Sequence, residues 1–170
     1  MSKHKHERRD HVARLVAQRR AVTPDIPLDG MEILGRARRL TLLSRPPIEG
    51  VLARRGVDAG EFDVLATLRR SNADAVRPTE LYQALMISSG GLTDRLRRLE
   101  SAGLIERVAC AQDKRSMLVR LTDKGQSIID LAFAEDMAVE LELLAALDPA
   151  ERETLADLLS KLLMSLETGA

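Results

Sequence analysis

Positively charged side chains outnumber negatively charged ones between residues 88 and 120 of this 170-residue chain, where they could bind a polyanion. This segment has 7 Lys and Arg against 4 Asp and Glu, and residues 1–57 have 13 against 6. Residues 121–170, in contrast, have 3 against 11. The net charge of zero therefore hides a segregation that favours one surface for a polyanion and a second surface for something else.

Patterns typical of enzymes and metal sites are missing from the sequence. There is no glycine-rich phosphate loop, no H-E-x-x-H and no nucleophile elbow, so we expect no catalytic residues, no cofactor and no enzyme activity. His4, His6 and His11 are too loosely spaced to define a metal site. The lone Cys110 leaves two interpretations open, an incidental thiol and an oxidation sensor.

The composition also limits where the protein works and how it binds. No run approaches about 18 uncharged apolar residues, so we expect no membrane span. The charged residues 1–11 are not followed by the apolar segment of a secretory signal, and a single cysteine is typical of a reducing compartment, so we expect a cytoplasmic protein. With only 2% aromatic residues, stacking on bases is a poor main mode of recognition.

Hydrophobic spacing predicts a mainly helical protein. A short helix around Val12 and Val16 is expected to stop before the prolines of residues 23–27. A long helix is expected from Asp29, as its N-cap, to Leu52. Further helices are predicted after the D-A-G-E capping box at 58–61, from Pro78 to Leu85, and over 123–146 and 149–167, the last after a D-P-A-E capping box at 148–151.

Residues 88–101 are expected to form a helix with two distinct faces. Ser88 or Ser89 can cap its start, and Gly103 can stop it. At about 100° per residue, one buried stripe consists of Leu92, Leu96 and Leu99. The opposite face is small, polar and cationic, with Gly90, Gly91, Asp94, Arg97 and Arg98. Because each glycine inside a helix costs about 0.8–1 kcal/mol relative to alanine, we expect the backbone there to approach another large surface.

The tight link M-I-S-S at 86–89 joins this helix to the one before it. Two helices so joined favour a helix-turn-helix, whose second helix enters the major groove of DNA. An ordinary helical hairpin with a solvated charged face is the alternative. A β-hairpin is predicted next, with strands at 104–108 and 116–121 and a charged tip that carries Lys114 and Arg115. Beside a recognition helix, such a tip can reach the adjacent minor groove.

These residues together resemble the winged helix-turn-helix signature of the MarR family of bacterial and archaeal transcription regulators. The similar features are a serine-capped recognition helix, G-L-I-E-R at 103–107, D-x-R at 113–115 and L-T-x-x-G at 121–125, and the resemblance covers about residues 30–166. It implies that DNA is bound by Ser88, Ser89, Gly90, Gly91, Thr93, Asp94, Arg97 and Arg98. It also implies that Asp113 holds the wing tip in shape and that Arg115 enters the minor groove.

The resemblance further implies an obligate dimer with interlocking terminal helices, for which residues 29–55, 123–146 and 149–167 are the candidates. The sequence supports this expectation on its own, because leucines recur at helical spacing after residue 151. They are Leu155, Leu158, Leu159, Leu162, Leu163 and Leu166. A solvated chain end has no use for such a stripe, although packing on its own subunit is an alternative.

A small-molecule effector is also expected. The extension before the core and the stretch G-E-F-D-V-L-A-T-L-R-R at 60–70 resemble the urate-responsive branch of the family, whose anion-binding positions match Asp63, Arg95 and Arg107. The tryptophan that this branch has on its first helix is Arg19 here, a departure that bears on urate itself. A plain ion pair between Asp63 and Arg95, supporting the recognition helix, is the alternative.

We therefore expect a mainly α fold with a small β-hairpin wing. The predicted parts are an N-terminal extension at 1–28, a dimerization helix at 29–57, a winged helix-turn-helix at 58–122 and dimerization helices at 123–170. The expected function is that of a homodimeric repressor, released from a pseudo-palindromic operator in double-stranded DNA by a small anionic or aromatic ligand. A winged-helix adaptor that binds protein instead of DNA is the alternative.

Overall fold

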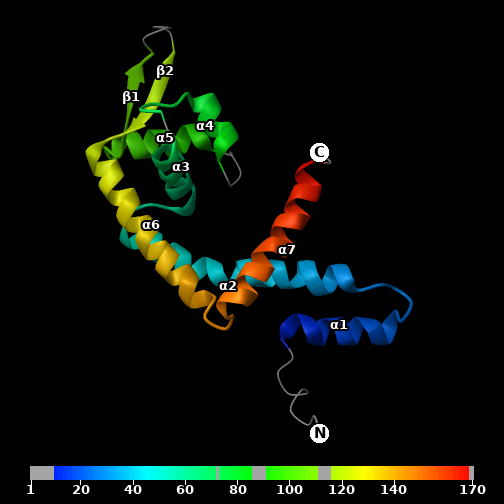
Figure 1. The fold of residues 1–170 in the computed structure, drawn as a ribbon. Coiled ribbons are helices and arrows are strands. Elements are labelled where there is room, and N and C mark those ends of the chain that lie inside the picture. Colours follow the sequence, from blue (N-terminus) through cyan, green and yellow to red (C-terminus); the bar gives the residue numbers. More distant parts are fainter. Residues whose placement is uncertain (1–9, 72, 86–90, 111–115, 169–170) are drawn as a thin grey trace. The chain divides into compact units, whose positions relative to one another are not determined.

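The computed structural model describes residues 10–71, 73–85, 91–110 and 116–168. They form a mainly helical fold with one two-stranded hairpin, as predicted (Figure 1). The elements in chain order are α1 (His11–Val22), α2 (Asp29–Arg54), α3 (Ala59–Arg70), α4 (Pro78–Ala84), α5 (Leu92–Ser101), β1 (Ile105–Ala109), β2 (Met117–Leu121), α6 (Asp123–Leu143) and α7 (Pro149–Glu167).

The chain divides into two compact units, one up to Pro46 and one from Pro47 onward, so that the division falls inside α2. In the first unit, Val12 and Val16 of α1 are buried together with Leu28, which confirms the short amphipathic helix. The long second helix is also confirmed, but Asp29 is its first residue and not the N-cap that we expected.

The second unit has one hydrophobic core, and α3 runs through its middle. Val64 and Leu65 of α3 are completely buried, and the helix packs against α4, α5 and α6. On its outer side, Arg69 forms two hydrogen bonds with Asp130 of α6, at 2.8 and 3.1 Å. Because α3 contacts both α5 and α6, its position fixes that of the predicted recognition helix relative to α6.

Both capping boxes that the sequence predicted are present. Asp58 and Glu61 make the capping box of α3, and Asp148 and Glu151 make that of α7. In each box the aspartate accepts from the amide of the glutamate, and the glutamate accepts from the amide of the aspartate. These hydrogen bonds satisfy backbone donors that the first helical turn leaves without a partner.

The hairpin β1–β2 is antiparallel, with Arg107 opposite Val119 and Ala109 opposite Met117. One further backbone hydrogen bond, from the amide of Cys110 to the carbonyl of Ser116 at 2.9 Å, extends the hairpin beyond the two strands. The sequence did not predict a third segment: Val76, just before α4, forms an isolated bridge with Val119. Through this bridge the segment before α4 and the hairpin are joined by backbone hydrogen bonds.

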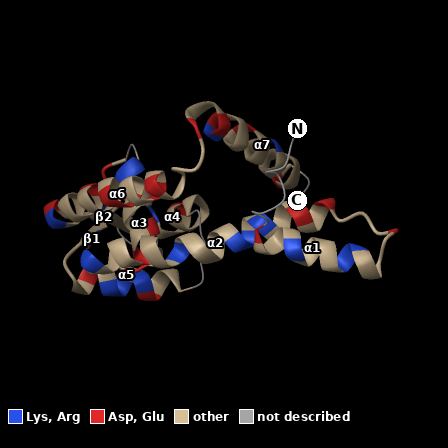
Figure 2. Cartoon of the chain, turned by 90° about the horizontal axis from the view of Figure 1, so that it is seen from below, with Lys and Arg blue, Asp and Glu red and all other residues tan. Residues whose placement is uncertain are grey.

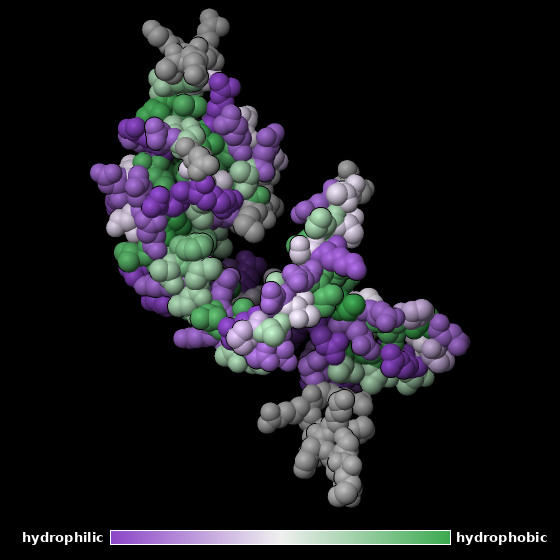
Figure 3. All heavy atoms as spheres, viewed as in Figure 1, coloured by the Kyte–Doolittle hydropathy of each residue, from purple (hydrophilic) through white to green (hydrophobic). Residues whose placement is uncertain are grey.

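Large apolar side chains remain at the surface of the C-terminal helices. On α6, Phe133 and Leu141 are about half exposed, and within the described chain no residue of α7 is buried. Figure 3 shows hydrophobic side chains at the surface along these helices. No helix among the described residues is both long and apolar enough to cross a membrane. The predicted leucine stripe is therefore present and uncovered in the single chain.

Candidate nucleic-acid interface

The N-cap of the predicted recognition helix, α5, lies two or three residues later than we expected. Its first residue is Leu92, and its N-cap is Gly91, whose φ of 79° lies in the left-handed region. The expected cap by Ser88 or Ser89 is therefore wrong for this helix, and Gly91 precedes it instead of standing inside it. A left-handed backbone conformation explains a glycine at this position without any close approach to another surface.

The two faces of α5 are those that the sequence predicted. Leu92, Leu96 and Leu99 are buried in the core, and the opposite face is exposed. That face carries Thr93, Asp94, Arg97 and Arg98. Figure 2 shows both Lys or Arg and Asp or Glu positions along α5, beside β1. The predicted DNA-binding residues Ser88, Ser89, Gly90, Asp113, Lys114 and Arg115 lie outside the described residues.

The charged side chains of α5 are linked to one another by ion pairs. Asp94 Oδ1 accepts a 2.6 Å hydrogen bond from Nη2 of Arg97, and Asp94 Oδ2 accepts one from Arg98. The hydrogen bond from Arg97 is the main reason that the pKa of Asp94 is lowered. Asp94 is therefore ionised at neutral pH, and it holds two arginines on the exposed face.

Arg98 also binds the first turn of α3. Its Nε donates to Oε1 of Glu61 at 2.7 Å, and its Nη2 donates to Oδ2 of Asp58 at 3.0 Å. The hydrogen bond with Glu61 is the main cause of the raised pKa of Arg98. These two partners could not be predicted from the sequence, because a helical wheel gives the direction of a side chain but not the element that lies in that direction.

The predicted effector residues lie on several elements. Arg95 packs its guanidinium over Gly60 of α3, where a Cβ atom would lie 2.3 Å from its Nε. Gly60 and the buried Asp63 are three residues apart on α3, so Arg95 reaches the face of α3 that carries Asp63. Arg107 of β1 donates to Glu100 of α5 at 3.1 Å. Arg19 is an exposed residue of α1, in the other unit.

A surface groove lies between α4 and the start of α5, and three of its residues, Thr79, Tyr82 and Gln83, were not predicted from the sequence. Its volume is about 500 Å³, and it is lined by Pro78, Thr79, Tyr82, Gln83, Gly91, Leu92 and Thr93. Tyr82 is about half exposed there. Pro78 could have indicated these residues from the sequence, because it marks the start of α4, and the first helix of a helix-turn-helix crosses the DNA backbone.

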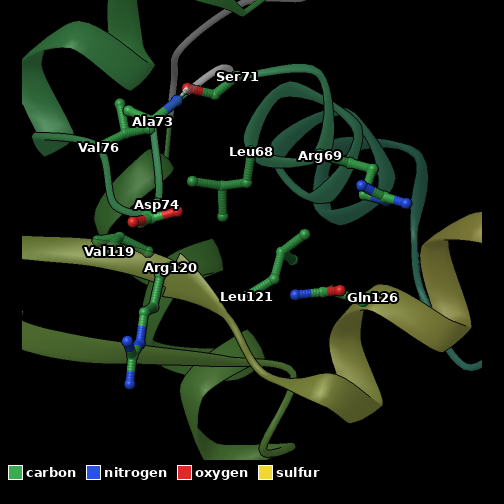
Figure 4. Close-up of a pocket in the computed structure, with 10 residues that line it drawn as sticks. All are labelled: Leu68, Arg69, Ser71, Ala73, Asp74, Val76, Val119, Arg120, Leu121 and Gln126. Carbon is green, nitrogen blue, oxygen red and sulfur yellow. Dashed lines mark hydrogen bonds between the residues drawn. The ribbon is translucent and has the colours of Figure 1, made fainter.

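A second cavity, of about 180 Å³, lies between the end of α3, the 73–76 segment, β2 and the start of α6 (Figure 4). Leu68 and Leu121 point into it, whereas Arg120 points away and pairs with Glu106 at 2.7 Å. None of the four predicted effector residues lines this cavity. It is therefore a different place from the predicted effector site.

Known proteins are similar to this chain in sequence and in fold. Residues 55–116 match the model of the MarR family. Over 151 residues the chain is 36% identical to the HTH-type transcriptional regulator PecS of Dickeya dadantii (strain 3937), and the match covers 88% of this chain and 91% of that regulator. The relative therefore aligns with both the helix-turn-helix and the helices on either side of it.

Solved structures resemble the chain over most of its length. A cysteine mutant of MarR from E. coli, complexed with operator DNA, superposes with a TM-score of 0.68 at 32% identity, covering 81% of this chain and 99% of that one. AbsC, a MarR family transcriptional regulator from Streptomyces coelicolor, superposes with a TM-score of 0.70 at 23% identity, covering 84% and 98%. The second likeness concerns the fold alone.

Proposed function

Because the chain belongs to the MarR family of winged-helix transcriptional regulators, we propose that it is a homodimeric, sequence-specific repressor that a small ligand releases from its operator. A regulator of this kind acts where the chromosome is, so we assign it to the cytoplasm. Membership of the MarR family supports DNA binding. Separate observations support the dimer and the ligand.

The observation that carries the proposal is the pair of faces on α5. One face is held in the core by leucines, and the other presents Thr93, Asp94, Arg97 and Arg98 to solvent next to the hairpin. A helix so held can enter a major groove, where a carboxylate can accept from cytosine and an arginine can donate to guanine. We assign base contacts to this face and phosphate contacts to the neighbouring groove with Thr79 and Tyr82.

The remaining DNA contacts follow the family resemblance. They include Ser88, Ser89 and Gly90 before α5, together with Gly91. In the wing they include Asp113, Lys114 and Arg115. Arg115 is the residue that we assign to the minor groove, since narrow minor grooves attract arginine.

A dimer is supported by the apolar side chains that the single chain leaves exposed. Leu159 and Leu163 of α7 are 45% and 55% exposed, and Leu34 and Leu43 of α2 are 50% and 55% exposed. Apolar surface on this scale marks an interaction site in a protein that functions in water. A second copy is the occupant that the family supplies, and a two-fold dimer would present two α5 helices to two half-sites.

For the effector we propose an anionic or aromatic molecule near Asp63, Arg95 and Arg107. Arg19 of α1 is the residue that replaces the tryptophan of the urate-responsive branch. The contact of Arg95 with the turn that precedes Asp63 supports this site. The test is to titrate urate and phenolic carboxylates while melting temperature and operator affinity are followed. A bound ligand should raise the melting temperature and lower the operator affinity, because it shifts the population toward one conformation. Arg107→Ala should lose both responses, and Arg120→Ala, on the same hairpin, should keep them.

The proposed function is tested by binding to the DNA upstream of the gene for this chain. We expect saturable binding whose affinity falls linearly with the logarithm of salt concentration, and stronger binding than to unrelated DNA of equal length. Absence of binding at low salt would exclude the repressor and favour an adaptor that binds protein.

A further inference from the structure

Arg98 joins the exposed face of α5 to the first turn of α3. Its Nε lies 2.7 Å from Oε1 of Glu61, and its Nη2 lies 3.0 Å from Oδ2 of Asp58. Its third nitrogen, Nη1, donates to Asp94 of its own helix. All three guanidinium nitrogens are therefore hydrogen-bonded to carboxylates, two of which belong to a different helix.

The carboxylates of Asp58 and Glu61 are held in place by hydrogen bonds that do not involve Arg98. Oδ1 of Asp58 accepts from the amide of Glu61 at 2.8 Å, and Oε2 of Glu61 accepts from the amide of Asp58 at 3.0 Å. These bonds form the capping box, and they leave one oxygen of each carboxylate for Arg98. Because the box fixes both side chains, the guanidinium meets a preformed pair of acceptors.

The same turn receives a second guanidinium from α5. Gly60 lies between the two carboxylates along the chain, and a Cβ atom there would be 2.3 Å from Nε and 2.5 Å from Cζ of Arg95. Arg95 and Arg98 are three residues apart, so they lie on neighbouring positions of one helix face. Arg95 therefore packs on the backbone of Gly60, and Arg98 pairs with the two carboxylates of the same turn.

We propose that residues 58–61 form a docking turn that sets the orientation of α5, and that Arg98 is a positioning residue that acts on DNA binding through Glu61. The inference rests on the proposed DNA-binding function. It assigns Arg98 the role of holding α5 in place instead of a direct contact with DNA. The Glu61 side chain is only 12% exposed, compared with 41% for Arg98 and 68% for Arg97. Arg98 in turn holds Asp94, which holds the far more exposed Arg97.

Glu61→Gln separates this role from a direct DNA contact. Glutamine at this position can still accept from the amide of Asp58, so the capping box survives while the charge is lost. Removing a negative charge should leave binding to a polyanion unchanged or strengthen it if Arg98 contacts phosphate. A docking role instead predicts that Glu61→Gln weakens operator binding, by about tenfold, the scale of one hydrogen bond to a charged group.

The full experiment compares Glu61→Gln, Arg98→Gln and the double variant by fluorescence anisotropy on operator and on unrelated DNA at several salt concentrations. We expect equal losses of operator affinity in both single variants, no further loss in the double variant and an unchanged salt slope. Glu100→Gln is the control, because it removes the partner of Arg107 from α5 without touching the docking turn. Circular dichroism melts establish that each variant is folded, and if Arg98→Gln is not, Arg98→Lys replaces it.

The inference is overturned if Glu61→Gln binds operator as tightly as the wild-type chain or more tightly. Loss of affinity for both DNAs in Arg98→Gln, with a shallower salt slope, would mean a phosphate contact instead. If the wild-type chain bound no DNA, the proposed function would fail, and hydrogen exchange in the free protein would decide the inference. Docking predicts faster exchange of the α5 amides in Glu61→Gln than in Glu100→Gln, and equal exchange would contradict it.

Discussion

Asp94 and Arg97 are joined across one turn of α5 by a 2.6 Å hydrogen bond on the face that we assign to DNA. The second oxygen of the same carboxylate accepts from Arg98. A negative charge on such a face opposes binding to any phosphate backbone, whereas it can favour a base with an exposed amino group. The pair should therefore increase discrimination between sequences and lower the affinity for unrelated DNA.

The first prediction follows from this pair. Asp94→Ala should strengthen binding to unrelated DNA, because it removes a negative charge, and it should reduce discrimination at one position of each half-site by about tenfold. Binding isotherms on matched and singly mutated operators measure both effects. Asp130→Ala is the control, since it also releases an exposed arginine, Arg69, but on α3. Unchanged discrimination in Asp94→Ala would remove Asp94 from base recognition.

The wing should contribute differently. Arg115→Ala should weaken binding to operator and unrelated DNA alike, because we assign Arg115 to the minor-groove potential and neighbouring phosphates. The salt slope should become shallower by roughly one unit for each subunit. Arg120→Ala, at the root of the hairpin and paired with Glu106, is the matched control. A change of base preference in Arg115→Ala would show that the roles of wing and helix are interchanged.

The leucine stripe of α7 should hold two chains together. Replacing Leu159 and Leu163 by aspartate would bury unpaired charges in the interface, so we expect loss of the dimer and of the cooperative thermal transition. Met164→Asp makes the same apolar-to-acidic change on the opposite side of the helix and should leave the dimer intact. Sedimentation equilibrium measures the mass of each variant. A folded, stable monomer of the double variant would contradict the assignment.

A buried carboxylate on α6 predicts how stability changes with pH. Asp136 is 4% exposed, its Oδ1 has no hydrogen-bond partner among the described residues, and burial raises its pKa. The folded state therefore favours the protonated form, and the cost of the buried charge is largest above the folded pKa. It disappears as the pH falls toward the unfolded value of about 3.9.

Asp136→Asn should accordingly raise the free energy of unfolding at neutral pH, on the order of 1 kcal/mol. The difference from the wild-type chain should shrink as the pH is lowered, because both chains are then uncharged at this position. Urea denaturation at a series of pH values measures it. Destabilisation by Asp136→Asn at neutral pH would mean that a cation from a partner subunit meets the carboxylate.

Local features of the fold could be predicted from the sequence, and long-range ones could not. The Asp58–Glu61 capping box, the Pro78 start of α4 and the stop at Gly103 depend on residues a few positions apart, so their pattern is visible in the sequence. The predicted start of α5 was wrong, because a sequence does not distinguish a glycine in the left-handed conformation, such as Gly91, from a glycine inside a helix. Only the backbone conformation distinguishes them.

The same limit applies to the candidate site. Periodicity identified the exposed face of α5, since it depends only on spacing within the helix. The pairing of Arg98 with Glu61 spans 37 positions in the chain, and the Val76–Val119 bridge spans more. Such contacts depend on how the elements pack, for which a single sequence carries no direct signal.

Hydroxyl-radical footprinting of the wild-type chain on the DNA upstream of its gene tests the central claim most directly. A two-fold dimer with one α5 in each half-site should protect two patches about 10 bp apart, on one face of a pseudo-palindrome. Both patches should appear together as the protein concentration rises. A single asymmetric patch, or no protection at low salt, would contradict a dimeric, sequence-specific regulator.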